Sequence, residues 1–249
     1  MLKLIKLEWK KNNIGKSIWI AMIMTAVLCL FIVGTSGELL SVATAGLHDS
    51  SGNPVGTNVS SAAETEFYGR NVFDAAVGIF TNMSYVIFTG VMLAAYIVGA
   101  YEKGTMSLMF SYPIKRRKII LSKMLAVWIF NVAALVVSKI VISIVLLFAN
   151  PVAHITTNEI QIASPDFWLY ILLNSIVMVS IAFVALPVGL KLHSSKAAIV
   201  AAVIVACFSQ GNIGSYTLAD SAPFYLLLLM LAAVSVYLAV CGVERKDVG

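Results

Sequence analysis

Few residues of this chain have the types and spacing that catalysis requires. The segment from Gly99 to Thr105, GAYEKGT, places two glycines at the separation found in a phosphate-binding loop. However, the Lys-Ser or Lys-Thr pair that must follow the second glycine to hold phosphates and Mg²⁺ is missing. The sequence therefore predicts no ATP site, no bound cofactor and no enzymatic activity in this chain.

The histidines and cysteines lack the spacing of a metal site. The three histidines are scattered over different segments, and the three cysteines fall within or at the ends of apolar stretches. We interpret the cysteines as small buried hydrophobic side chains and expect no metal or disulfide. The residues concerned are His48, His154, His193, Cys29, Cys207 and Cys241.

One residue, Lys139, carries a formal charge deep inside a long apolar stretch. Intramembrane charge usually marks function, so Lys139 is a candidate functional charge that faces a pathway or a carboxylate such as Glu38. A lysine that extends to the membrane surface or packs between helices is an equal alternative. No carboxylate lies in the middle of a predicted span, which weighs against a proton- or sodium-coupled transporter.

The composition excludes a water-soluble protein. Hydrophobic residues occupy 60% of the 249 positions and charged residues 12%, against roughly 45–50% and 25% in soluble domains. Most of the long charge-free stretches approach or exceed the roughly 20 residues that cross a hydrocarbon core. We therefore predict an all-α integral membrane protein, a single transmembrane domain over 1–249 with six transmembrane helices. The predicted spans are 17–37, 80–101, 124–150, 167–190, 197–219 and 223–243.

Proline and polar residues indicate where these helices end. We expect Pro151 to end the third span, Pro187 to kink or break the fourth near its cytoplasmic end, and the QGNIG segment to interrupt the fifth. Residues 38–79 lie between the first two spans, and their first half is rich in turn residues. Over 62–80 apolar and polar residues alternate with helical spacing, so a helix that runs into the second span is predicted.

The distribution of basic residues predicts the orientation. Of the 17 Lys and Arg residues, 15 lie before the first span, between spans two and three, between spans four and five, or after span six. Because the chain crosses the membrane at each span, these segments all lie on one side. Arg70 and Lys139 are the exceptions. The positive-inside rule makes that side cytoplasmic. Both termini are therefore predicted to be cytoplasmic, as an even number of spans requires.

Residues 1–16 are predicted to form an amphipathic helix on the inner surface of the membrane. Ile5 and Trp9 fall on an apolar face, while Lys10 and other lysines fall on a basic face. Such a helix places its aromatic residue at the lipid headgroups and its lysines toward anionic lipid. A short basic tail is the alternative.

The segment 102–123 joins the second and third spans on the cytoplasmic side. Glu102 to Phe110 contains helix formers, Pro113 ends that turn, and basic residues lead back into the membrane. A short amphipathic helix followed by a proline turn presents a rigid surface to a soluble partner. On charge alone, a loop that only sets the topology is the favoured alternative.

The residue pattern of this loop favours a partner. The order E-x-G-T-x-x-L-x-x-x-x-P-I-x-R-x-x-x-x-x-x-K, from Glu102 to Lys123, resembles the loop after the second helix in permeases of type 2 ABC transporters. The resemblance is closest to the small peptide-resistance and bacteriocin-immunity group. In that family the loop holds a coupling helix that docks on a separate ATPase subunit. The docking residues that the resemblance implies are Glu102, Gly104, Thr105, Pro113 and Arg116, and we include Leu108 and Tyr112 of the same loop in the candidate docking set.

The resemblance implies a permease subunit of an ATP-driven exporter in a bacterial cell membrane. ATP and Mg²⁺ would bind the partner ATPase, and a second permease subunit, identical or related, would complete the transporter. The predicted outer surface carries eight acidic residues against one basic residue, which would concentrate cationic amphipathic peptides, although solubility of that surface explains the excess equally well. Together with the resemblance, this charge suggests an antimicrobial or other amphipathic peptide as substrate. An ion-coupled secondary transporter and a non-transporting membrane scaffold or sensor are the alternatives, and no nucleic-acid partner is expected. The acidic residues are Glu38, Asp49, Glu64, Glu66, Asp74, Glu159, Asp166 and Asp220.

Overall fold

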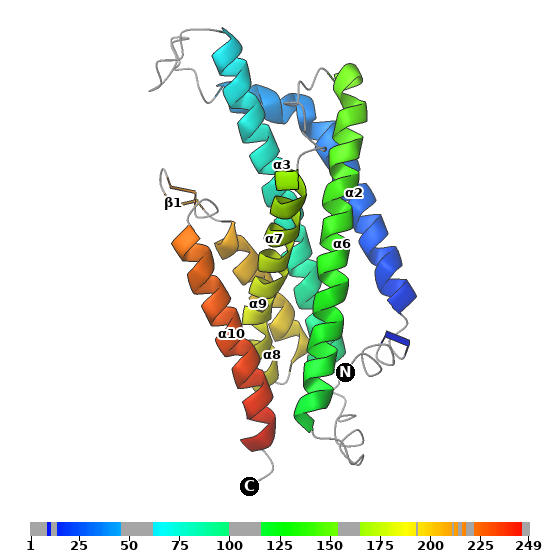
Figure 1. Ribbon diagram of the computed structural model, residues 1–249, viewed down its shortest axis with the longest axis vertical. Coiled ribbons are helices and arrows are strands. Elements are labelled where there is room, and N and C mark those ends of the chain that lie inside the picture. Colours follow the sequence, from blue (N-terminus) through cyan, green and yellow to red (C-terminus); the bar gives the residue numbers. More distant parts are fainter. Residues whose placement is uncertain are drawn as a thin grey trace. The chain divides into compact units, whose positions relative to one another are not determined.

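The computed structural model describes residues 9–10, 14–45, 62–99, 116–153, 165–192, 194–210, 212–213, 216–217 and 222–245 (Figure 1). Nearly all of these residues are helical, so the predicted all-α class is confirmed for the described chain, apart from one very short hairpin. The helices are α2 (Ile14–Ala45), α3 (Ala62–Leu93), η1 (Ala94–Val98), α6 (Arg116–Ala153), α7 (Pro165–Ile181), η2 (Ala182–Ala185), α8 (Leu186–Leu192), α9 (Ser195–Ser209) and α10 (Ala222–Arg245).

In the part of the chain that the structure describes, four helical segments are long and apolar enough to cross a membrane. They cover Ile14–Thr35, Val77–Val98, Ile119–Leu146 and Trp168–Leu192. Within the described residues, two shorter apolar helices cover Ser195–Ser209 and Leu226–Val240. These helices indicate a multi-pass membrane protein, while the count of six spans and the cytoplasmic location of both termini stay predictions.

Large apolar side chains on the helix surfaces also indicate a membrane environment. Leu30 in α2, Phe208 in α9 and Met230 in α10 are 75%, 67% and 71% exposed. Side chains of this kind line whole helices, and a soluble protein rarely exposes apolar patches of that extent. We infer that these faces contact hydrocarbon.

Two helices extend further than predicted. The helix predicted over 62–80 is confirmed, because α3 runs without a break from Ala62 into the second span. The helix of the third span begins at Arg116, eight residues before the predicted 124–150, and it ends at Ala153. Pro151 therefore lies in the last turn of α6 and does not stop it, since proline interferes only with the preceding turn.

The fourth span breaks where proline predicts a break. Helix α7 ends at Ile181, η2 is a 3₁₀ segment, and α8 follows with Pro187 as its second residue. Pro187 has no N–H group, so the carbonyl oxygen of Phe183 has no α-helical donor four residues ahead. The tighter 3₁₀ winding accommodates this local change.

The fifth predicted span, 197–219, is too long. Helix α9 ends at Ser209, and Gln210 has a non-helical backbone with φ −117° and ψ 9°. Two strands, β1 (Asn212–Ile213) and β2 (Tyr216–Thr217), then pair in antiparallel fashion, the first residue of one opposite the last of the other. Asn and Gly in this stretch favour turns over helix, which explains why the helix stops.

The chain divides into two compact units, each built from parts of several helices. Unit 1 comprises Met1–Ile18, Asn82–Val136 and Tyr170–Gly249. Unit 2 comprises Trp19–Thr81 and Val137–Leu169. The assignment of 1–249 to a single transmembrane domain stays a prediction.

Unit 2 has a small apolar core formed by parts of α2, α3 and α6. Phe31 and Phe80 pack edge to face, with ring centroids 5.7 Å apart. The Oγ1 of Thr25 and the Oγ of fully buried Ser138 lie 3.0 Å apart and share a hydrogen bond between α2 and α6. Apolar burial with occasional hydroxyl bonds is typical of helix packing in membranes. The buried core residues are Ile32, Val77, Ile142 and Leu146.

Unit 1 contains the helix ends that border segment 102–123. Helices α8, α9 and α10 lie beside one another in this unit, with η1 against α8 and α9 (Figure 1). This arrangement places the C-terminal end of the second span inside the packed part of the unit.

Candidate coupling site

Most of the predicted docking residues fall outside the described chain. Glu102, Gly104, Thr105, Leu108, Tyr112 and Pro113 are in this group, and Arg116 is the first residue of α6. The structure describes the helices on either side of the docking segment. The helix before the segment is described as far as Gly99, and α6 is described from Arg116.

The described part of the helix before the segment includes a π-helix, η1, over its last residues. The N–H of Gly99 bonds to the carbonyl oxygen of Ala94, five residues back, where an α-helix would reach back four. Ala94, Ile97 and Val98 of η1 are buried. π-Helical segments are rare and frequently lie at functional sites. This part of the helix is thus unusual in backbone winding and is held by packing.

Small residues bring this helix close to α9. Gly90 faces Ala202, and Ala94, four residues on, packs with Ala198. Ala198, Ala202 and Ala206 are spaced by four along α9 and are at most 2% exposed. A Cβ added to Gly90 would overlap the Cβ of Ala202. Small residues at this spacing let helix backbones approach closely in membranes, where van der Waals packing drives association. We call these five residues the small-residue seam.

Helix α8 joins the same contact through a second glycine. A Cβ added to Gly189 would lie 2.5 Å from the Cβ of Ala198 and 3.0 Å from Cγ2 of Val98. Ala94, Val98 and Ala198 form one buried cluster at this point. Three segments of unit 1, namely η1, α8 and α9, therefore meet directly behind the first end of the docking segment.

The second end of the docking segment is joined to the first by Lys123. This side chain in α6 is only 3% exposed, and its Nζ donates a 3.4 Å hydrogen bond to the carbonyl oxygen of Tyr96 in η1. The phenol oxygen of Tyr96 lies 3.3 Å from Oγ of Ser17 near the start of α2. Lys123 was not among the predicted docking residues, although it is the last residue of the loop pattern and the last charged residue before the predicted third span.

The predicted interfacial helix contacts the same region. Trp9 and Lys10 are helical, Lys10 is exposed, and Ile5 lies outside the described residues. The Nε1–H of Trp9 donates a 3.3 Å hydrogen bond to the carbonyl oxygen of Ala126 in α6. Trp9 thus anchors this segment to α6, a contact that the amphipathic pattern did not predict.

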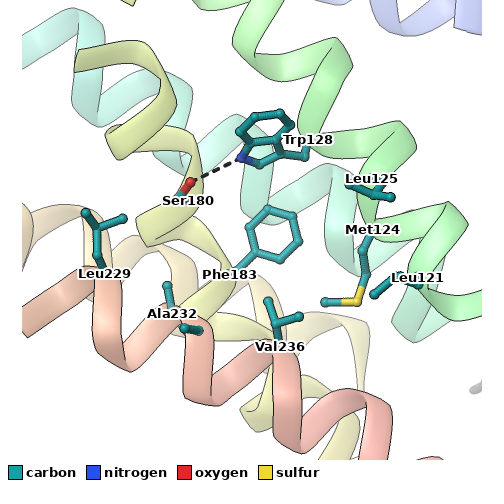
Figure 2. Close-up of a pocket in the computed structure, with 10 residues that line it drawn as sticks. Leu121, Met124, Leu125, Trp128, Ser180, Phe183, Leu229, Ala232 and Val236 are labelled. Carbon is teal, nitrogen blue, oxygen red and sulfur yellow. Dashed lines mark hydrogen bonds between the residues drawn. The ribbon is translucent and has the colours of Figure 1, made fainter. Parts of the chain in front are cut away.

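An apolar cavity of about 360 Å³ lies beside the start of α6. Figure 2 shows its walls, formed by α6, by the end of α7 with η2, and by α10. Nε1–H of Trp128 donates to Oγ of Ser180 over 3.1 Å, and that hydroxyl donates to the carbonyl oxygen of Ile176 over 2.7 Å. Because these polar groups already bond to protein, the walls present an apolar surface. The other lining residues are Leu121, Met124, Leu125, Phe183, Leu229, Ala232, Ala233 and Val236.

Comparison with known proteins identifies the family. Residues 4–210 match the family model described as ABC-2 family transporter protein. The chain belongs to the ABC-2 transporter family. This ABC-2 chain is also 21% identical over 180 residues to "Uncharacterized protein YcbO" of Bacillus subtilis (strain 168), covering 69% of this chain and 75% of that protein. No solved structure matches it.

Family membership confirms the resemblance that segment 102–123 indicated. The match extends well beyond that segment and includes the helix ends described above. Proteins of the ABC-2 family are membrane components of transporters, and catalysis is not their role. This ABC-2 chain is therefore a membrane component of a transporter.

Lys139, the candidate intramembrane charge of this ABC-2 chain, is half-buried in the part of α6 that belongs to unit 2. Its neighbour Ser138 faces α2, as the hydrogen bond to Thr25 requires. Glu38, the carboxylate considered as its partner, lies in α2 at a position whose side chain the structure does not describe. A functional role for Lys139 stays a prediction.

Proposed function

We propose that this ABC-2 transporter chain is the permease subunit of an ATP-driven exporter in a bacterial cell membrane, powered by a separate ATPase subunit docked on residues 102–123. The observation that supports this most directly is the anchoring of both ends of the segment. The first end is packed through Val98 against Gly189 and Ala198, and the second is bonded through Lys123 to Tyr96. A loop that only set the topology would need neither anchor.

Tight packing behind the docking segment is the property that mechanical coupling requires. ATP binding would close a pair of ATPase subunits and displace the docked segment. Packed interiors transmit displacement because they compress little. Movement of η1 would then shift α8 and α9 through the small-residue seam, since the seam leaves no space to absorb it.

Two permease subunits would form the complete route. The predicted six spans are few to enclose a path across the bilayer, so a second copy or a related permease would pair with this chain. Each permease would dock one ATPase, and ATP with Mg²⁺ would bind there. Docking would use Glu102, Gly104, Thr105, Pro113 and Arg116, as the family resemblance implies, together with Leu108 and Tyr112.

A cationic amphipathic or antimicrobial peptide is the substrate class we propose. The excess of acidic residues on the predicted outer surface supports it, because negative potential raises the local concentration of cations. The resemblance of the docking segment to peptide-resistance permeases supports it as well.

Affinity purification of the tagged chain in mild detergent tests the coupling role. We expect an ATPase to copurify with the wild-type chain and to be lost when Glu102, Thr105 and Pro113 are changed together to alanine. The matched control changes Lys115 and Lys118 to glutamine, which alters basic residues outside the proposed docking set and should leave the complex intact.

Recovery of the chain alone, without ATP hydrolysis under several extraction conditions, would contradict an ATPase-powered permease. Transport in ATP-free vesicles under an ion gradient would then favour the secondary transporter. Tight binding of a partner without nucleotide dependence would favour the scaffold or sensor.

The substrate class is tested separately in cells. Deleting the gene should raise sensitivity to cationic amphipathic peptides and slow the release of a fluorescein-labelled peptide built from leucine and lysine. Unchanged resistance and unchanged release would show that the substrate class is wrong, while the ATPase experiment would still decide the permease role.

A further inference from the structure

We propose that Lys123 is a positioning residue that holds together the two helical stems on either side of residues 102–115, so that the stems move together. The stems are η1 on one side and the first turns of α6 on the other. This inference rests on the proposed function for its consequence in transport, but the contact itself can be tested in the permease alone.

The geometry places the ammonium group of Lys123 against the backbone of η1. Its Nζ donates a 3.4 Å hydrogen bond to the carbonyl oxygen of Tyr96, a residue of that π-helix. A hydrogen bond with one charged partner is stronger than one between neutral groups. The bond therefore offsets part of the cost of burying the cation.

Burial makes this contact costly to break. Lys123 is 3% exposed, and an ion removed from water needs hydrogen bonds to offset its lost hydration. Spreading the two stems would take the Tyr96 carbonyl away from the buried Lys123 side chain and so remove this hydrogen bond. The stems consequently resist separation more strongly than an apolar contact of the same size would.

Two further hydrogen bonds extend this connection to the N-terminal part of the chain. Tyr96, whose carbonyl accepts from Lys123, also shares a hydrogen bond through its phenol oxygen with Ser17. Three residues after Lys123, the carbonyl of Ala126 accepts from the indole of Trp9. All five residues belong to unit 1. A displacement of the docking segment would thus be carried by both stems and by the start of α2 together.

Spin labels placed just beyond the two stems, one on the helix that leads into η1 and one further along α6, test the proposal. Val91 on α3 and Ile129 on α6 are each 37% exposed, which leaves room for a label at both positions. In a cysteine-free background the labelled variant is Val91→Cys with Ile129→Cys. With Lys123 present, we expect the same narrow distribution of label distances without nucleotide and in the complex trapped with ATP and vanadate.

Changing Lys123 should make the distribution of label distances broader or dependent on nucleotide. We expect Lys123→Met to lose the narrow distribution, and Lys123→Arg to keep it because arginine retains a cationic donor. The matched control is Lys196→Met, the same substitution at an exposed lysine of unit 1, which should leave the distribution unchanged. Rescue by arginine separates a positioning role from a general effect of buried volume.

Two results would overturn the proposal. One is a distance distribution that changes with nucleotide although Lys123 is present, a measurement that stays available even where Lys123→Met does not fold. The other is a Lys123→Met protein whose distribution is as narrow as that of the wild type. If no ATPase copurifies, the proposed function fails, while the same labels in the isolated permease still report whether Lys123 holds the stems together.

Discussion

Gly90 of α3 lies so close to Ala202 of α9 that a Cβ added to the glycine would overlap the alanine Cβ. Both positions belong to helix interiors, where glycine costs about 0.5–1 kcal/mol relative to alanine. The close approach of the two backbones is what the absence of a side chain at position 90 permits.

Gly90→Ala should destabilise the protein despite the better helix propensity of alanine. Overpacking a well-packed contact costs about 1–3 kcal/mol, which exceeds the gain of about 1 kcal/mol in propensity. Gly78 is the matched control, because it lies in the same helix and has no atom within 4 Å of the position its Cβ would occupy. Thermal unfolding in detergent should show a lower Tm for Gly90→Ala and an unchanged or higher one for Gly78→Ala. Equal shifts at both positions would contradict the seam.

Gly189→Ala should also lower the Tm, and a second substitution should reverse the loss. The added methyl group would lie 2.5 Å from the Cβ of Ala198, so Ala198→Gly removes the atom that it meets. Contacting residues show non-additive changes in stability, with coupling of about 0.5–3 kcal/mol. We expect the double variant to be more stable than Gly189→Ala alone. Additive losses in the double-mutant cycle would show that the two residues do not touch.

Trp9→Phe should weaken the attachment of the N-terminal segment to α6. The substitution keeps an aromatic ring but removes the donor to the Ala126 carbonyl, a hydrogen bond worth about 1 kcal/mol. Limited proteolysis of the N-terminal segment should become faster. Trp19→Phe serves as the control, because Trp19 is 67% exposed and should give no change. An unchanged cleavage rate in Trp9→Phe would argue against the anchor.

Ser180→Ala should destabilise the wall of the apolar cavity, and Trp128→Phe should relieve part of the cost. Ser180→Ala leaves the indole N–H of Trp128 without its acceptor, and an unsatisfied buried donor costs about 1–3 kcal/mol. The double variant removes donor and acceptor together. Its loss of unfolding free energy should therefore be smaller than the sum of the losses in the two single variants. Chemical unfolding followed by far-UV circular dichroism measures the cycle. Strict additivity would mean that the hydrogen bond is not formed.

Features with a local cause could be predicted from the sequence. The helix over 62–80 follows from its alternation of apolar and polar residues, and the break near Pro187 follows from a missing N–H group. The class, an integral membrane protein, follows from apolar stretches that are too long and too numerous for a water-soluble domain. The loop pattern from Glu102 to Lys123 predicted the family, which the match over residues 4–210 confirms.

Features that depend on a distant partner could not be predicted in the same way. The four-residue spacing of Gly90 and Ala94 is visible in the sequence, but only the packed structure shows that Gly90 faces Ala202. The π-helical winding of η1 has no sequence signal of its own, and the bond from Lys123 to Tyr96 joins residues 27 positions apart. The predicted fifth span ends early, and Asn212–Ile213 pairs with Tyr216–Thr217 where its last part was expected. The turn-forming residues there favour a hairpin more strongly than the short apolar stretch favours a helix.

The 3₁₀ break in the fourth span has a mechanical consequence. Helix α7 ends at Ile181, whereas α8 beyond the break is fixed to α9 by the contact of Gly189 with Ala198. A helix bends most easily where its hydrogen-bond ladder is interrupted. Bending of this span is therefore expected first at Ala182–Ala185, between α7 and the part of the span that is fixed to α9.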